Sequence, residues 1–465
     1  MKDLAILFAG IAVVGMFTRI EPISGWWRAL RNEHYLMAFV VPLLVLFGWP
    51  LEGVSAFRDG DQLGWQRVAR MVFFGLIATH FVLKDLARQR TAVPPYSFFS
   101  VFGAYTLLCA LSAFWSRESL QSLWKAIELV VVLMVTIELY QSRKNPVDRA
   151  ASIAGSLMFL TFALCLMSII GAVLAPERAW RDWGLEGLGV RSMGGAIPMI
   201  NPNMLGQLGG MVAMVGILRF LLRPRRPTLG DLIVPAVGVV TLFLAYSRTS
   251  LIACLIIFVL TAVSMRRSSW LVVLAVFGVI IGTFFLEELI VYLVRGQTAE
   301  QFATLTGRLV MWDAALSAFW ERPLFGHGFF VGHKYVEVAS TGKLLATADS
   351  TYVETLVNLG FAGLTLISLF AIMTSLQAWR SLSHSRYSPV HLQEIAMVFF
   401  VVIAFTMIRS VTASSFQVLH YNLVFLLIAL IGLAFLDRSF PRSCARRPNI
   451  VASEGFDSQV NSRLC

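Results

Sequence analysis

Residues 232–265 read LIVPAVGVVTLFLAYSRTSLIACLIIFVLTAVSM, and Arg248 is the one charged side chain in this stretch. Two apolar runs, 232–247 and 249–265, flank it with almost no loop between them. A helix crosses the apolar core of a bilayer with about 17–25 residues. We therefore predict two consecutive membrane helices that meet at Arg248.

Similar apolar runs recur along the 465 residues, which are 57% hydrophobic and only 14% charged, against about a quarter charged in soluble domains. The runs are continuous, whereas the strands of a membrane β-barrel alternate apolar and polar residues. We predict an all-α polytopic membrane protein with about 12–13 transmembrane helices. The other runs are approximately 4–17, 35–50, 68–83, 96–115, 122–140, 151–175, 203–222, 270–286, 352–375, 394–412 and 420–436.

Short basic loops indicate the orientation. If the runs alternate in direction, the clusters near residues 84–90, 143–149, 223–226, 266–267 and 380–386 all fall on one side. Cytoplasmic loops collect Lys and Arg, so we place this side in the cytoplasm. The same rule explains the net charge of +11, and no nucleic-acid partner is expected.

The opposite face then receives one large periplasmic loop, residues 288–351, which is inserted in a single transmembrane domain, residues 1–436. This loop contains a predicted helix, residues 307–320, with Leu309, Trp312, Leu316 and Phe319 on one face. The polar tail, residues 437–465, is expected to be cytoplasmic and disordered.

Arg248 is the first candidate for chemistry. A guanidinium at membrane depth is costly and needs an anionic partner. The planar fork of Arg suits phosphate, because it donates two parallel hydrogen bonds. Alternatively, Arg248 snorkels to the interface or pairs with an internal carboxylate. The residues alone do not choose between these.

The segment 176–203 holds a second group of candidates. Arg181 and Arg191 lie among tryptophans, and Asn201-Pro202-Asn203 opens the next helix. Asn is a good N-cap, and a helix N-terminus is itself an anion site. The alternative is an interfacial aromatic belt with ordinary surface arginines.

The third group lies in and after the long loop: Arg308, His327, His333 and Asp349. Asp349 is a candidate general base, since partial desolvation raises the pKa of a carboxylate. The alternative is a helix N-cap, because Asp349 and Ser350 directly precede an apolar run. The two histidines are titratable groups of the outer face, and the alternative for each is a structural role.

These groups, in this order, resemble the O-antigen ligase and polymerase family of bacterial membrane enzymes. The Gly-Arg-x-x-x-Trp run at residues 307–312 and the Pro-x-x-Gly-x-Gly turn at residues 323–328 are similar to family motifs. So are Ser350 with Gly360 and Gly363 after it, Asn201-Pro202-Asn203, Ser247-Arg248 and the region of residues 111–124. The resemblance covers roughly residues 100–375.

The resemblance implies glycosyl transfer at the periplasmic face of the bacterial inner membrane, from a glycan on undecaprenyl pyrophosphate to a sugar hydroxyl. The family carries a catalytic His where this chain has Asp349, which favours a polysaccharide polymerase. The alternative is an O-antigen ligase, whose acceptor is lipid A core or protein. His327 or His333 taking over the role of the family His also stays open.

A site follows from the resemblance together with the charges. Arg248 and Asp349 are the catalytic candidates. The candidates for binding pyrophosphate or glycan are Arg191, Arg308, Arg181, Asn201, Asn203, His327 and His333. Fixed positive charge stabilises a pyrophosphate leaving group without a metal, and no His-Glu-x-x-His pattern demands one, so neither metal nor cofactor is expected.

The expected partners are the lipid-linked glycan, inner-membrane lipid, a chain-length regulator and export machinery. A flippase or transporter of lipid-linked oligosaccharide is the alternative from another class, because it also needs arginines in an outer cavity. The structured outer loop argues against a transporter, as does the lack of a visible internal repeat.

Overall fold

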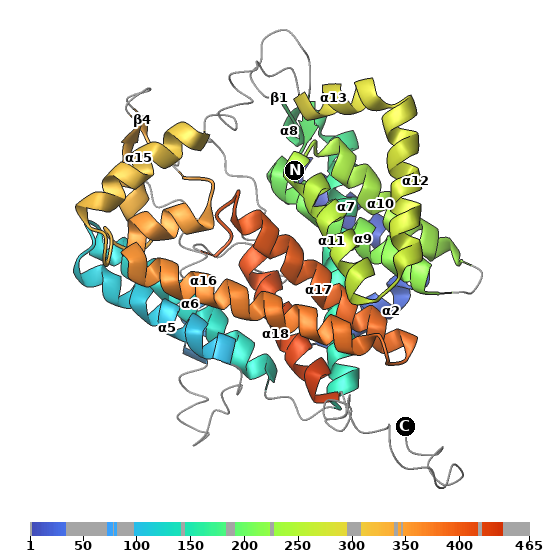
Figure 1. The fold of residues 1–465 in the computed structure, drawn as a ribbon, viewed down its shortest axis with the longest axis horizontal. Coiled ribbons are helices and arrows are strands. Elements are labelled where there is room, and N and C mark those ends of the chain that lie inside the picture. Colours follow the sequence, from blue (N-terminus) through green and yellow to red (C-terminus); the bar gives the residue numbers. More distant parts are fainter. Residues whose placement is uncertain are drawn as a thin grey trace, which may run out of the picture.

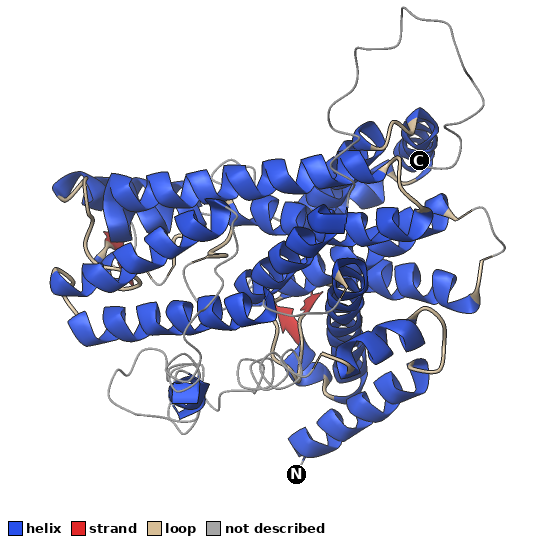
Figure 2. Cartoon of the chain, turned by 90° about the horizontal axis from the view of Figure 1, so that it is seen from below, coloured by secondary structure: helices blue, strands red, loops and turns tan. Residues whose placement is uncertain are grey.

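The computed structural model describes residues 2–33, 72–77, 79–80, 97–140, 145–182, 191–223, 227–294, 308–338, 343–345, 347–416 and 421–439. These residues are almost entirely helical, with two short antiparallel hairpins (Figures 1 and 2). The predicted run 35–50 and residues 440–465 of the predicted tail lie outside the described residues, as does half of the run 68–83.

Every other apolar run coincides with a helix. These helices are α1 (Lys2–Phe17), α5 (Ser97–Leu111) with the 3-10 turn η3 (Ser112–Phe114), α6 (Ser119–Tyr140), α7 (Pro146–Leu174), α9 (Pro202–Leu222), α10 (Leu229–Leu244), α11 (Arg248–Ser264), α12 (Ser268–Phe284), α16 (Thr351–Ser385), α17 (Val390–Ser410) and α18 (Tyr421–Ser439).

Six helices of the described residues, α6, α7, α9, α16, α17 and α18, are long and apolar enough to cross a membrane. The apolar helices α1, α5, α10, α11 and α12 are shorter. The all-α polytopic membrane fold is therefore confirmed, while the number of 12–13 spans stays a prediction.

Some boundaries differ from the prediction because helices continue through polar residues. α16 runs to Ser385, and α18 includes Asp437, whose carboxylate accepts hydrogen bonds from Gln377 and Ser381 of α16. Residues 437–439 are therefore helical, not part of a tail. Between the predicted runs 4–17 and 35–50, the structure has an amphipathic helix, α2 (Ile23–Arg31), that packs on α7.

Small residues let the central helices approach closely. A Cβ on Gly238 of α10 would lie 2.3 Å from the backbone nitrogen of Ala213 in α9. On α9, a Cβ on Gly210 would lie 2.7 Å from the ring of Phe405 in α17. Such contacts are typical of membrane helix bundles, where the hydrophobic effect does not drive helices together and close van der Waals packing does.

Contacts divide the bundle into two ends. At one end, Arg223 after α9 pairs with Glu394 of α17 at 2.5 Å, and Ser264 of α11 contacts Ser383 of α16 at 2.7 Å. At the other end, Thr351 of α16 donates to the carbonyl of Ala413 after α17. The described residues of the predicted basic clusters, among them Arg223, Arg266 and Arg386, thus lie at the end opposite the start of α16, as the alternation of runs predicts.

The segment between α12 and α16 is largely folded where it is described. It holds α13 (Leu286–Val294), α15 (Arg308–Glu321), η4 (Gly332–Tyr335) and the hairpin of β3 (Glu337–Val338) with β4 (Lys343–Leu344). The predicted helix is thus confirmed as α15. On its predicted face, Phe319 is buried and Trp312 packs beside it, whereas Leu309 and Leu316 are exposed.

Candidate functional site

Three charged residues predicted from the sequence come together at the end of the bundle where α16 starts. Nε of Arg308, the first residue of α15, lies 3.6 Å from Oδ2 of Asp349. The charge of Arg308 also acts on Arg248, the first residue of α11, and on Arg409 near the end of α17. We call Arg248, Arg308, Asp349 and Arg409 the charged cluster.

Arg409 was not predicted, because it lies inside the apolar run 394–412. Its residue surface is 4% exposed, and Nη1 donates to Oγ1 of Thr249 at 2.5 Å. Its Nε is buried with no hydrogen-bond partner in the described part of the chain. The signal was present in the sequence, since an ionisable residue within an apolar run marks a functional site by default.

Asp349 does not cap α16, so the alternative of an N-cap is wrong. Ser350 occupies the N-cap position, and no side chain there makes a capping hydrogen bond. Asp349 has φ of +48°, a left-handed conformation that Asp tolerates better than most residues. The carboxylate of Asp349 pairs with Arg308 instead of with the backbone of α16.

The carboxyl of Asp349 is partly buried, with 42% of its side-chain surface exposed. Burial raises its pKa above the usual value, and the charge of Glu354 raises it further. The guanidinium of Arg308 opposes both effects. A carboxylate in this setting accepts a proton more readily than a solvated one.

Glu354, one turn into α16, holds the segment that carries Asp349. Its Oε1 accepts from Oγ1 of Thr347 at 2.6 Å, from the backbone nitrogen of Ala348 at 2.9 Å, and from Ser414 after α17. Glu354 is 2% exposed, so these bonds satisfy a buried charge. It is a positioning residue that sequence reasoning did not single out.

The two glycine motifs of the sequence interlock at a break in α16. Gly360 has φ of +64° within the helix, and the turn of residues 322–328 fills the gap. Phe361 N donates to Pro323 O at 2.8 Å, while His327 N and Gly328 N donate to the carbonyls of Val357 and Asn358. The turn therefore satisfies backbone groups that the break leaves open, as an interrupted membrane helix requires.

The two histidines lie on either side of this interlock, and neither touches the charged cluster in the described contacts. Nε2 of His327 lies 2.8 Å from the carbonyl of Ala318 in α15. His333 is buried, and its backbone nitrogen and Nδ1 both contact Oδ1 of Asn358, at 2.9 and 3.1 Å. His333 thus has the contacts of a structural residue.

The remaining candidates lie on other elements. Arg181 and Arg191 belong to a hairpin of β1 (Trp180–Asp182) and β2 (Arg191–Met193), where Arg181 pairs with Ser192 and Arg191 with Asp182. Asn201 is the N-cap of α9, as predicted, and its side chain accepts from the backbone nitrogen of Asn203 at 2.9 Å. This hairpin contacts α9 and α10.

Comparison with known protein families finds a match over the elements that build most of the charged cluster. Residues 233–368 match the family model of the O-antigen ligases. The match confirms the resemblance to the O-antigen ligase and polymerase family, and it includes Arg248, Arg308 and Asp349 but not Arg409. No curated protein matches the chain at a significant level. The chain is thus similar to membrane enzymes of O-antigen ligase type, which transfer glycans.

Proposed function

We propose that this protein is an inner-membrane glycosyltransferase that polymerises oligosaccharide repeat units carried on undecaprenyl pyrophosphate, at the periplasmic face. The observation that carries the proposal is the charged cluster, which joins the first residues of two helices, the end of a third and Asp349. Three guanidinium groups stand there against Asp349 and the buried Glu354, which leaves an excess of positive charge.

Fixed positive charge is what a pyrophosphate leaving group requires. As the bond between the sugar and the phosphate breaks, negative charge grows on the phosphate oxygens, and preorganised donors stabilise it without reorganising. Arg248, Arg308 and Arg409 supply planar donors that pair with phosphate oxygens two at a time. In the proposal they hold the donor and need no metal to do so.

Asp349 takes the proton of the acceptor. The hydroxyl oxygen of the acceptor sugar bonds to the anomeric carbon of the donor, and the bond from that carbon to the phosphate oxygen breaks. The electron pair leaves with undecaprenyl pyrophosphate, and the hydroxyl proton passes to the carboxylate of Asp349. Arg308 orients that carboxylate, and Glu354 holds the segment that carries it.

An O-antigen ligase is the second candidate, because the matching family model bears that description. The chemistry at the donor is the same, and only the acceptor differs: a second lipid-linked glycan for a polymerase, lipid A core or protein for a ligase. A chain-length regulator and export machinery are proposed partners of the polymerase.

Reconstitution of the purified protein in liposomes tests the proposal. Lipid-linked repeat units are supplied on the outer leaflet, and released undecaprenyl pyrophosphate and glycan length are measured together. A polymerase releases the lipid and lengthens the glycan, whereas a ligase needs lipid A core in addition. A flippase moves lipid-linked glycan across the membrane and releases nothing, which would overturn the proposal.

A further inference from the structure

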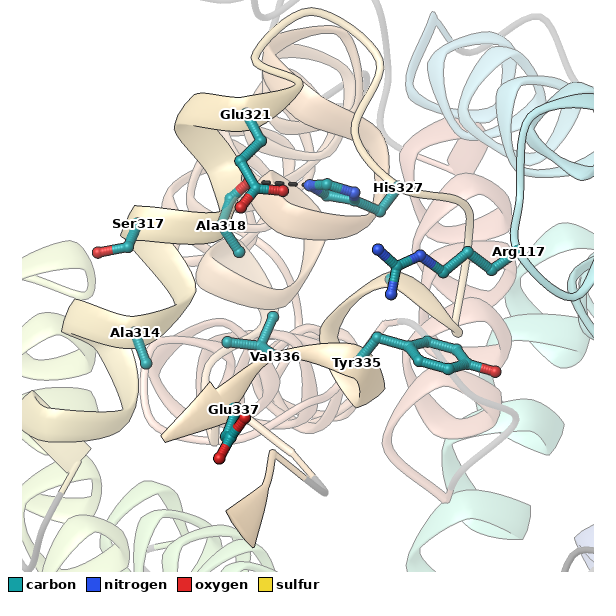
Figure 3. Close-up of a pocket in the computed structure, with 10 residues that line it drawn as sticks. Arg117, Ala314, Ser317, Ala318, Glu321, His327, Tyr335, Val336 and Glu337 are labelled. Carbon is teal, nitrogen blue, oxygen red and sulfur yellow. Dashed lines mark hydrogen bonds between the residues drawn. The ribbon is translucent and has the colours of Figure 1, made fainter. Parts of the chain in front are cut away.

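A pocket of about 250 Å³ opens beside α15, away from the charged cluster (Figure 3). Its floor is buried and is made by His327, Gly332 and Val336. Its rim is exposed and charged, with Arg117, Glu321 and Glu337. The other residues that line it are Ala314, Ser317, Ala318 and Tyr335.

Three separate segments build this pocket. Ala314, Ser317, Ala318 and Glu321 recur at the spacing of one helical face of α15, and η4 with β3 closes the opposite wall. Arg117 enters from the turn before α6 and points into the pocket (Figure 3). That turn is tied to the interlock, because Nε1 of Trp115 donates to the carbonyl of Phe325 at 3.1 Å.

Arg117 is held in place by an aromatic ring. The guanidinium of Arg117 lies over the ring of Tyr335, 5.1 Å from its centre, and the hydroxyl of Tyr335 donates to Glu118. Nε2 of His327 lies 2.8 Å from the carbonyl of Ala318, which only accepts, so this nitrogen carries a hydrogen and donates it. A guanidinium fixed over an aromatic ring loses less freedom when a ligand binds.

The lining selects a ligand rich in hydroxyl groups. The carboxylates of Glu321 and Glu337 can accept hydrogen bonds from ligand hydroxyls, and the guanidinium of Arg117 can donate hydrogen bonds to the same kind of group. The pocket disfavours an anionic ligand such as a phosphate or a uronic acid. The two negative charges of Glu321 and Glu337 would repel it more strongly than the one positive charge of Arg117 would attract it. Pockets for drug-sized ligands have volumes of about 300–1,000 Å³, and this pocket is smaller. It therefore suits a unit no larger than one sugar.

The pocket lies at a useful distance from the charged cluster. Arg308 begins α15, and the pocket residues of the same helix follow from Ala314 to Glu321. At about 1.5 Å per residue, this places them roughly 9–20 Å along the axis from Arg308. A sugar there is remote from the bond that forms but within reach of the same glycan.

We propose that this pocket is a remote subsite that binds one neutral sugar ring of the glycan substrate. The proposal rests on the proposed function, and it names the part of the substrate that the charged cluster does not touch. Binding energy from such a remote unit is available to position the reacting groups.

The first experiment compares kinetics in reconstituted liposomes. Glu321→Gln, Glu337→Gln and Arg117→Ala should each raise the KM for lipid-linked repeat units roughly tenfold, as expected for one lost charge-assisted hydrogen bond. Asp313→Asn and Arg322→Ala remove matched exposed charges on or beside α15, outside the pocket, and should keep the KM of the unaltered protein. An unchanged KM in all three pocket variants would overturn the subsite.

The second experiment measures binding directly. Saturation-transfer NMR of the detergent-solubilised full chain uses methyl glycosides of glucose, galactose, N-acetylglucosamine and glucuronic acid. At least one neutral glycoside should give a signal that Glu337→Gln and Arg117→Ala lose and Asp313→Asn keeps. A signal from glucuronide alone, a signal that survives the pocket variants, or no signal contradicts the proposal.

The two experiments separate the failure of the subsite from that of the proposed function. If the chain is not a glycosyltransferase, the unaltered protein releases no undecaprenyl pyrophosphate at all. If only the subsite is wrong, release is normal, Arg248 variants still lose it, and the pocket variants behave like the unaltered protein.

Discussion

Nε of Arg308 and Oδ2 of Asp349 lie 3.6 Å apart. Arg308 is the first residue of α15, whereas Asp349 lies just before α16. The pair joins a candidate anion-binding group to a candidate base. Arg308 favours the ionised form of Asp349, while burial and Glu354 favour the protonated form. The net result is a pKa of Asp349 above its usual value, so the carboxylate is more basic than in water, which suits a general base.

Arg248 should need its planar fork. Arg248→Lys keeps the charge but loses bidentate pairing, so we expect turnover to fall about 10- to 100-fold, which corresponds to one charge-assisted hydrogen bond of about 1.5–3 kcal/mol. Arg248→Ala should lose nearly all activity while the protein still inserts. Release of undecaprenyl pyrophosphate at matched protein levels is the measurement. Full activity of the Lys variant would mean that a point charge suffices, and full activity of the Ala variant would remove Arg248 from the site.

Arg409 should behave as a member of the same cluster. Arg409→Gln keeps a donor toward Thr249 but removes the charge, and we expect turnover to fall at least tenfold, as for one lost charge-assisted hydrogen bond. Thr249→Val removes only the hydroxyl that Arg409 contacts and should have a smaller effect. Thermal melting of both variants checks that they fold. Normal turnover of folded Arg409→Gln would give Arg409 a purely structural role.

Gly360 should be irreplaceable for folding. A Cβ there would lie 2.4 Å from the carbonyl carbon of Leu324, and the backbone conformation (φ +64°, ψ −159°), which essentially only glycine adopts, costs a side chain roughly a further 1–3 kcal/mol. Gly360→Ala should therefore lower the melting temperature of the solubilised protein strongly. Gly278→Ala is the matched control, because nothing lies within 4 Å of its Cβ and Ala favours a helix. Equal melting temperatures in the two variants would contradict the interlock.

The continuous apolar runs predicted the helices well, because a membrane-spanning helix faces either lipid or other apolar helices along its whole length. They predicted the meeting of two helices at Arg248, since only Tyr246 and its neighbours separate α10 from α11. They missed α2, which is short and amphipathic and is stabilised by packing on α7, not by its own propensity. The strand pairing of residues 180–182 with 191–193 likewise depends on tertiary context.

The sequence indicated site residues where a charged residue interrupts an apolar run or lies in a segment that resembles a family motif. Arg248, Arg308 and Asp349 were found in this way, but their proximity depends on how α11, α15 and α16 pack, which sequence spacing does not encode. Glu354 was missed because its partners, Ala348 and Ser414, come from two separate segments. Arg409 was missed although, like Arg248, it is an ionisable residue within an apolar run and so carried the same signal.

The orientation is testable by labelling. We predict that α15 lies in the periplasm, because the basic loops gather at the opposite end of the bundle. Cys444 and Cys465 are first replaced by Ser, and Asp313→Cys then places a thiol at an exposed position of α15. A membrane-impermeant maleimide should label intact spheroplasts. Labelling only after permeabilisation would invert the orientation and, with it, the proposed chemistry.

The pH dependence of turnover should report the pKa of Asp349. The deprotonated carboxylate is the base, so activity should fall as the pH drops through that pKa, which burial places above the usual range of Asp. Asp349→Asn should remove the activity and this acidic limb together. Since an Asn backbone also tolerates the left-handed conformation, the loss would not reflect strain.

Asp349→His provides the decisive comparison with Asp349→Asn. Imidazole accepts a proton with an ordinary pKa of about 6.5, so partial activity should return with its acidic limb moved to higher pH. Asp349→Ala, which neither accepts a proton nor contacts Arg308, should be inactive. If Asn works as well as Asp at matched protein levels, Asp349 is not the base. His327 and His333 then become the next residues to test.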